Sequence, residues 1–146
     1  MRNDASSGFT LIEMLVAMVI VALGMSVAAT TLIRSGSNFE ARRIAREITT
    51  LASEARYSAD RDGRPRALVF DVAARTLTAE SGESLYVPEP FHVELASAES
   101  VGPGRIAFYP SGASSGGQVR LTSPRIEIVV KVDWLTSHIE TMEALP

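Results

Sequence analysis

Three residues near the N-terminus have types and a spacing that could support chemistry: Gly8, Phe9 and Glu13. Glu13 is the only charged residue between Phe9 and Ile33, in a run of 25 residues that is otherwise apolar or uncharged. An ionisable group inside such a run is costly and is retained mostly where it has a function. Glu13 is therefore a candidate functional residue.

The run from Phe9 to Ile33 is long enough to cross a bilayer. As a helix it would measure roughly 37 Å, against a hydrocarbon layer of roughly 30 Å. A cleaved secretory signal is the alternative reading, with a small-residue cleavage site ending at Ala29 and Arg2 upstream. The length of the run and the glutamate within it favour a retained membrane anchor.

The stretch Gly8-Phe9-Thr10-Leu11-Ile12-Glu13, followed by the apolar run, resembles the processing site of the type IV pilin family and its relatives, the pseudopilins of type II secretion. The resemblance implies that prepilin peptidase cuts after Gly8, that Phe9 becomes N-methylphenylalanine, and that Glu13 serves assembly. It also implies a single-pass protein of the bacterial inner membrane, with its globular domain in the periplasm.

The chemistry of these residues agrees with that resemblance. About one helical turn separates Phe9 from Glu13, so the two lie on one face of a helix. Cleavage after Gly8 would create a charged amine in lipid, where an unpaired charge is expensive, and a carboxylate one turn away, on this chain or a neighbour, could neutralise it. The helix dipole also favours an acid in the first turn. The simpler alternative is that Glu13 only snorkels to the headgroups.

Two features depart from the family pattern. The leader contains Asp4 as well as Arg2, whereas the leaders of this family are usually more basic. Arginines 34, 42, 43 and 46 follow the apolar run on its expected periplasmic side, whereas the positive-inside rule alone would orient the segment the other way. For the orientation of the segment, the processing motif is given more weight than the charge count, so the globular domain is expected in the periplasm.

Beyond the apolar run, the sequence predicts that the helix continues. The whole helix is expected to extend from Phe9 to Ala59. Ser35-Gly36-Ser37-Asn38 is a weak helix stretch within it. The helix should end near Asp60–Gly63, because Gly63 can adopt the left-handed cap and Pro65 cannot continue a helix. One narrow apolar stripe is expected to complete a core, and its members are Ala41, Ile44, Ile48, Leu51, Ala52 and Ala55.

From Arg66 the apolar pattern changes to a period of two, which indicates strands. The predicted strands are Arg66–Val72, Thr76–Glu80, Leu85–Val87, Phe91–Leu95, Arg105–Tyr109, Gln118–Leu121 and Ile126–Asp133, with a weaker one at Ser137–Thr141. The order of elements matches an α+β, pilin-like fold, in which a long N-terminal helix packs on an antiparallel β domain of about seven or eight strands. The expected segments are a leader (1–8), a transmembrane and assembly helix (9–33), its amphipathic periplasmic continuation (34–62) and a β-rich domain (63–146).

Within the family, Ile106–Gly112 followed by a Ser/Gly loop and Gln118–Leu121 resembles the H-type minor pseudopilins and the related minor pilins of type IV pili. The implied function is a structural subunit of the type II secretion pseudopilus, at or near its tip, that supports protein export. The alternative is a minor pilin of a type IV pilus, involved in pilus initiation or DNA uptake. Those domains often carry a Gly-Arg turn before the last strand, where this chain has Trp134–His138 instead.

The resemblance also implies partners. These are prepilin peptidase, the major pseudopilin, other minor pseudopilins and the inner-membrane assembly platform, with secreted cargo or the secretin as further candidates. No cofactor, metal or catalytic residue is expected.

Four other features could indicate a catalytic, metal-binding or partner-binding site. Gly112–Gly116 fits G-x-S-x-G, but a strand-like segment follows it where a hydrolase requires a helix, so a hairpin loop is favoured over a nucleophilic Ser114. Asp60–Gly63 resembles the start of a calcium loop without its remaining ligands, so a capped helix end is favoured. His92 is expected on the polar face of a strand, because side chains alternate between the two faces. Trp134 is interpreted as a core or edge residue, and a contact with a partner is the alternative.

Charge and composition narrow the function classes further. Residues 34–66 carry eight arginines and five acids, whereas residues 67–146 carry five basic and ten acidic residues. The acidic globular half argues against nucleic acid as a partner, and the arginines at 56, 61, 64 and 66 alternate with acids as on a solvated face. The chain has no cysteine, so it has neither a disulfide nor a thiolate metal site.

Overall fold

A computed structural model describes residues 10–144, with the side chains of residues 26–37 left out. The chain divides into two compact units, Met1–Gly36 and Ser37–Pro146. One helix, α1 (Leu11–Asp62), contributes residues to both. The second unit also contains eight strands and a short 3₁₀ helix, η1 (Glu99–Val101), which agrees with the predicted α+β, pilin-like fold.

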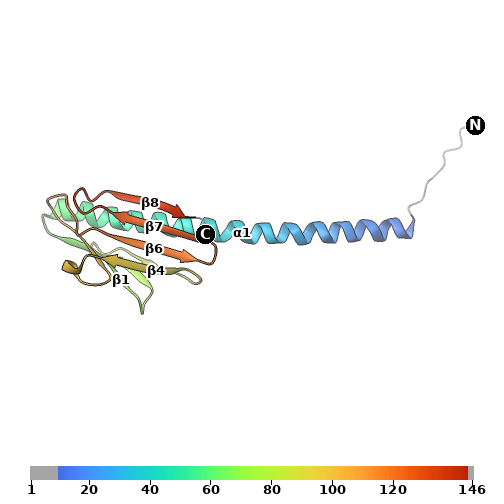
Figure 1. Cartoon of the computed structure of the whole chain (residues 1–146), viewed down its shortest axis with the longest axis horizontal. Helices are drawn as coiled ribbons and strands as arrows, with labels where there is room; N and C mark the ends of the chain where they lie inside the picture. Colours follow the sequence, from blue (N-terminus) through green and yellow to red (C-terminus); the bar gives the residue numbers. More distant parts are fainter. Residues whose placement is uncertain (1–9, 145–146) are drawn as a thin grey trace, which may run out of the picture. The chain divides into compact units, whose positions relative to one another are not determined.

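The strands form two antiparallel sheets of four strands each. The order in the first is β3 (Ser84–Tyr86), β2 (Thr76–Ala79), β1 (Arg66–Asp71), β5 (Arg105–Phe108). The order in the second is β4 (His92–Ser97), β6 (Gly117–Ser123), β7 (Ile126–Val132), β8 (Ile139–Ala144). Figure 1 shows β4, β6, β7 and β8 side by side.

The end of α1 follows from its sequence. The helix stops at Asp62, and Gly63 takes a positive φ of 62°, which a residue without a Cβ adopts at little cost. Pro65 then prevents any continuation. The predicted helix end is confirmed.

The apolar stripe of α1 is buried in the second unit. All six predicted members lie in one core cluster that also contains side chains from both sheets, such as Leu68, Phe108 and Ile128. Two small sheets cannot bury enough apolar surface alone, so the helix supplies the missing side of the core. This expectation is confirmed.

The last hairpin differs from the sequence expectation in its details. β8 begins at Ile139 rather than Ser137, because Ser137 takes a positive φ of 53° in a turn that spans Asp133–His138. β7 and β8 nevertheless pair from Val132↔Ile139 to Glu127↔Ala144, so a C-terminal hairpin is present although Trp134–His138 replaces the Gly-Arg turn of related domains. Trp134 belongs to the turn and is largely exposed, so its assignment to the core was wrong.

Candidate functional site

Glu13 is the one predicted site residue that lies within the described part of the chain. It occupies the first turn of α1, and its side chain is exposed. Gly8 and Phe9 lie outside the described residues. The geometry of the proposed pair between the Phe9 amine and the Glu13 carboxylate therefore stays a prediction.

Thr10 caps the start of α1. The backbone N–H of Glu13 donates to the Thr10 hydroxyl at 3.3 Å and to the Thr10 carbonyl at 3.1 Å. A side-chain oxygen in this position satisfies a backbone donor that the helix itself leaves free. The sequence reasoning missed this cap, although threonine followed three residues later by glutamate is the sequence pattern of a capping box.

The cap has a consequence for the candidate site. It starts the helix at Leu11, and so places Glu13 in the first turn, where the helix dipole favours a negative charge. Among the described residues, the carboxylate of Glu13 takes part in no ion pair.

Apolar side chains surround Glu13 along the helix. Leu11, Ile12, Met14 and Leu15 are all exposed, and every described side chain up to Met25 is exposed as well. In the part of the chain searched for membrane spans, no helix is both long and apolar enough to count as one. The predicted transmembrane segment 9–33 extends beyond that part, because Phe9 and the side chains of residues 26–33 lie outside it.

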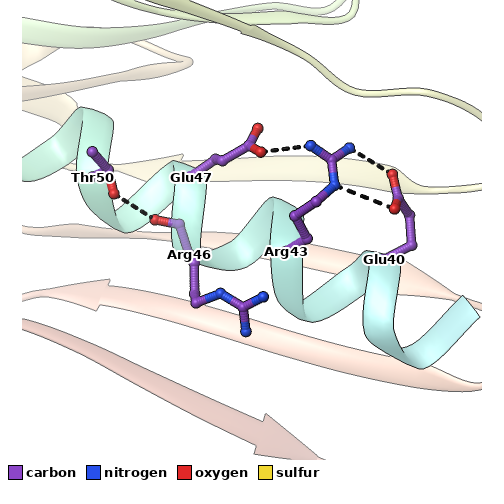
Figure 2. A network of polar contacts seen from close by, with 5 residues as sticks. All are labelled: Glu40, Arg43, Arg46, Glu47 and Thr50. Carbon is purple, nitrogen blue, oxygen red and sulfur yellow. Dashed lines mark hydrogen bonds and ion pairs between the residues drawn. The ribbon is translucent and has the colours of Figure 1, made fainter.

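The exposed face of α1 in the second unit carries a ladder of ion pairs (Figure 2). The Arg43 guanidinium bonds to Glu40 and to Glu47, each at 2.6 Å. The bond from Arg43 lowers the pKa of the Glu40 carboxyl. Figure 2 shows the Arg46 guanidinium turned away from this ladder. Exposed pairs of this kind contribute little to stability, and the ladder is a solvated surface.

Two of the arginines at 56, 61, 64 and 66 are paired with an acid. Asp62 accepts from Arg66 at 2.6 Å and from Arg61 at 3.2 Å, and these two bonds lower the pKa of the Asp62 carboxyl. Arg42 forms a two-bond pair with Glu143 of β8. Because phosphate binding needs uncompensated cations, this arrangement favours the solvated-face interpretation.

The Gly112–Gly116 and Asp60–Gly63 stretches, which resemble a hydrolase motif and a calcium loop, both have structural explanations. Ser114 of the G-x-S-x-G stretch is buried, its hydroxyl donates to the Asp133 carbonyl at 2.8 Å, and it accepts from the Gly116 N–H at 3.0 Å. β6 follows this loop, as expected. The carboxylate of Asp62 is engaged by arginines, and the searched residues contain no group of three or more potential metal ligands.

Comparison with known proteins connects the N-terminal motif to a described family. The family "Prokaryotic N-terminal methylation motif" matches residues 3–29. The chain is also 28% identical over 138 residues to "Type II secretion system protein H" of Xanthomonas campestris pv. campestris, and the match covers 92% of this chain and 82% of that protein. No solved structure gives a significant match. The motif and the similarity over most of the chain together support an H-type pseudopilin, which confirms the predicted resemblance.

Proposed function

We propose that this protein is a minor pseudopilin that is cut after Gly8, methylated at Phe9 and assembled into a short periplasmic pseudopilus for type II secretion. The observation that carries the proposal is Glu13. It is an acid in the capped first turn of a helix, at the motif spacing from Gly8-Phe9, and it has no ion-pair partner within the described chain. The likeness to protein H supports type II secretion as the system.

The mechanism follows from the cost of charge in lipid. Trimming the leader (residues 1–8) frees an amine at Phe9 at the start of an apolar helix, and an unpaired charge there is strongly disfavoured. Glu13 of the same chain neutralises the amine in the membrane, and Glu13 of a neighbouring subunit does so in the filament. The exposed apolar side chains from Leu11 to Met25 then pack against those of neighbouring stems by van der Waals contact.

The proposed location and partners follow from the same mechanism. Residues 9–33 span the inner membrane, residues 34–62 continue the helix in the periplasm, and residues 63–146 form the β-rich part of the periplasmic domain. Prepilin peptidase acts first, and the assembly platform then passes the subunit to the major pseudopilin and the other minor pseudopilins. We place the subunit at or near the tip, where the secretin and secreted cargo are within reach.

The first experiment reads the mature N-terminus. Mass spectrometry of the full protein, purified from cells with active prepilin peptidase, should find a chain that begins at N-methylated Phe9. A chain that begins at Thr30 would indicate an ordinary secreted domain, and a chain that retains Met1 would remove the basis of the proposal.

The second experiment tests the acid itself. Glu13→Ala should leave membrane insertion and cleavage intact but reduce incorporation into the pseudopilus and secretion into the medium. Glu47→Ala is a matched control, because Glu47 lies on the same helix and pairs within its own chain. Normal secretion by Glu13→Ala would contradict the pairing mechanism.

A minor pilin of a type IV pilus remains the alternative. A gel-shift with duplex DNA distinguishes a DNA-uptake role, since binding that weakens steeply with salt would support it. Neighbouring genes of a pilus system, instead of a secretion system, would also favour this alternative.

A further inference from the structure

A groove of about 480 Å³ lies between the second half of α1 and the edge strand β8, within the second compact unit. Its floor is apolar, because Ala45 and Ile128 are both almost fully buried. Hydroxyl and charged side chains form the rest of the lining, from Arg42, Arg46, Thr49, Thr50, Thr141 and Glu143. An apolar hollow with a few polar groups around it is the usual character of a binding site.

Two contacts cross the groove and hold α1 beside β8. Arg42 pairs with Glu143 at 2.8 Å, and the hydroxyl oxygens of Thr49 and Thr141 lie 3.3 Å apart. The lining residues of α1 extend from Arg42 to Thr50, which is about 12 Å of helix. An extended peptide covers that length with about four residues. The groove therefore has the size of a short peptide segment.

Arg46 is a cation of the groove without an acid of its own. Among the described residues it takes part in no ion pair, whereas Arg42 and Arg43 are both paired. Figure 2 shows the Arg46 guanidinium turned away from the ion-pair ladder of Arg43. A guanidinium presents a planar set of donors that matches a carboxylate, and the charge strengthens the hydrogen bonds. The groove thus favours a ligand that carries a carboxylate.

The backbone of β8 offers a second means of recognition. β8 is the last strand in its sheet, and within the described residues no strand pairs with its outer edge. The free N–H and C=O groups of such an edge can pair with an added strand, whose backbone gives affinity and whose alternate side chains give selectivity. Side chains opposite each other in a sheet point to the same face. Because Thr141 and Glu143 line the groove, an added strand would direct alternate side chains into it.

The charges on the two faces of β8 determine where an acid fits. On the groove face, Arg42 neutralises Glu143 and Arg46 remains. Glu140 lies on the other face, because side chains alternate along a strand. The residue that faces the groove should therefore be acidic, and its neighbours uncharged. Nucleic acid and anionic lipid surfaces need clustered cations instead, and residues 67–146 are net acidic.

We propose that the groove between α1 and β8 binds an extended, acidic peptide segment of a protein partner as an added strand. The backbone of the segment pairs with the outer edge of β8, one carboxylate bonds to Arg46, and a small apolar side chain fills the hollow above Ala45 and Ile128. Two β8 strands paired with each other would bring together the glutamates of both copies, which disfavours a second copy in this position. The inference goes beyond the proposed function and uses no residue of the processing motif.

Binding of defined peptides to the purified full chain in mild detergent tests the site. The probe is Thr-Val-Glu-Val-Thr with blocked termini and an uncharged fluorophore, and Thr-Val-Gln-Val-Thr is the matched neutral peptide. Fluorescence anisotropy should show that the acidic peptide binds roughly tenfold more tightly, because its carboxylate bonds to Arg46. Arg46→Ala should remove this difference and leave the affinity for the neutral peptide unchanged.

Arg43→Ala is the matched control, because its guanidinium is already engaged by Glu40 and Glu47, and it should change neither affinity. Three results overturn the inference. They are equal affinities of the native chain for the two peptides, the same loss from Arg43→Ala as from Arg46→Ala, and no binding up to about 1 mM peptide.

Amide hydrogen exchange locates the bound peptide. The acidic peptide should slow exchange in β8 and leave exchange in β4, the other edge of the same sheet, unchanged. Slower exchange in β4, or unchanged exchange in β8, overturns the inference. Raising the concentration of the chain without peptide tests for a second copy. If that alone slows exchange in β8, a second copy occupies the edge and the inference is wrong.

Discussion

Replacing Ile48 by alanine tests whether the second half of α1 completes the core of the globular unit. Ile48 is fully buried, in a cluster with side chains from both sheets. The substitution removes three buried carbon atoms, worth roughly 2.4 kcal/mol at about 0.8 kcal/mol each. A residual cavity of roughly 40 Å³ adds about 1 kcal/mol at about 24 cal/mol per Å³. The expected loss in the free energy of unfolding is therefore about 3 kcal/mol.

The assay is thermal and urea unfolding of the full chain in mild detergent, followed by circular dichroism. Fluorescence is a poor reporter here, because the single tryptophan is already exposed in the folded unit. For a unit of this size, the loss corresponds to a fall in Tm of about 10 °C. Arg46→Ala is the control, because Arg46 lies two residues away on the exposed side of the same helix, and it should change stability by only about 0.5 kcal/mol.

A clear result would refute the reasoning. If Ile48→Ala and Arg46→Ala unfold at the same temperature, the stripe of α1 does not support the sheets. The β-rich part would then have to be stable without the helix, contrary to the single core cluster that joins them.

Three further changes follow from the described contacts. Gly117→Ala should destabilise the globular unit by about 2 kcal/mol or more in urea unfolding, since a Cβ would lie 2.7 Å from the Ala96 carbonyl oxygen and φ is 143°. Ser114→Ala should cost about 1–3 kcal/mol in the same assay, because it leaves a buried N–H without its acceptor. Arg42 lowers the pKa of the Glu143 carboxyl below its ordinary value of 4.5, so this pair should stabilise above that pH and lose its effect as the pH falls through the lowered pKa. Glu143→Gln should remove that part of the acid dependence of Tm, and an unchanged profile would show that the pair does not form in solution.

Much of the fold could be read from local patterns. The buried stripe around Ile48 repeats at the helical period, and the helix end at Asp62 follows from Gly63 and Pro65. The strands also lie where alternation placed them, because alternation reflects burial on one face. The Thr10 cap was not predicted although its signal is local, because Glu13 belongs both to the capping-box pattern and to the Gly8-Phe9-Glu13 motif.

The sequence by itself determined the elements and the candidate processing motif, because helix periodicity, caps and motif spacing depend on residues within a few positions of each other. The tertiary structure alone decided which strands pair, and it placed Trp134 on the surface. The turn around Trp134 is held by Ser114 and Gly112, about twenty residues earlier in the chain. A side chain whose surroundings come from such distant segments can be assigned to core or surface only when the chain is folded.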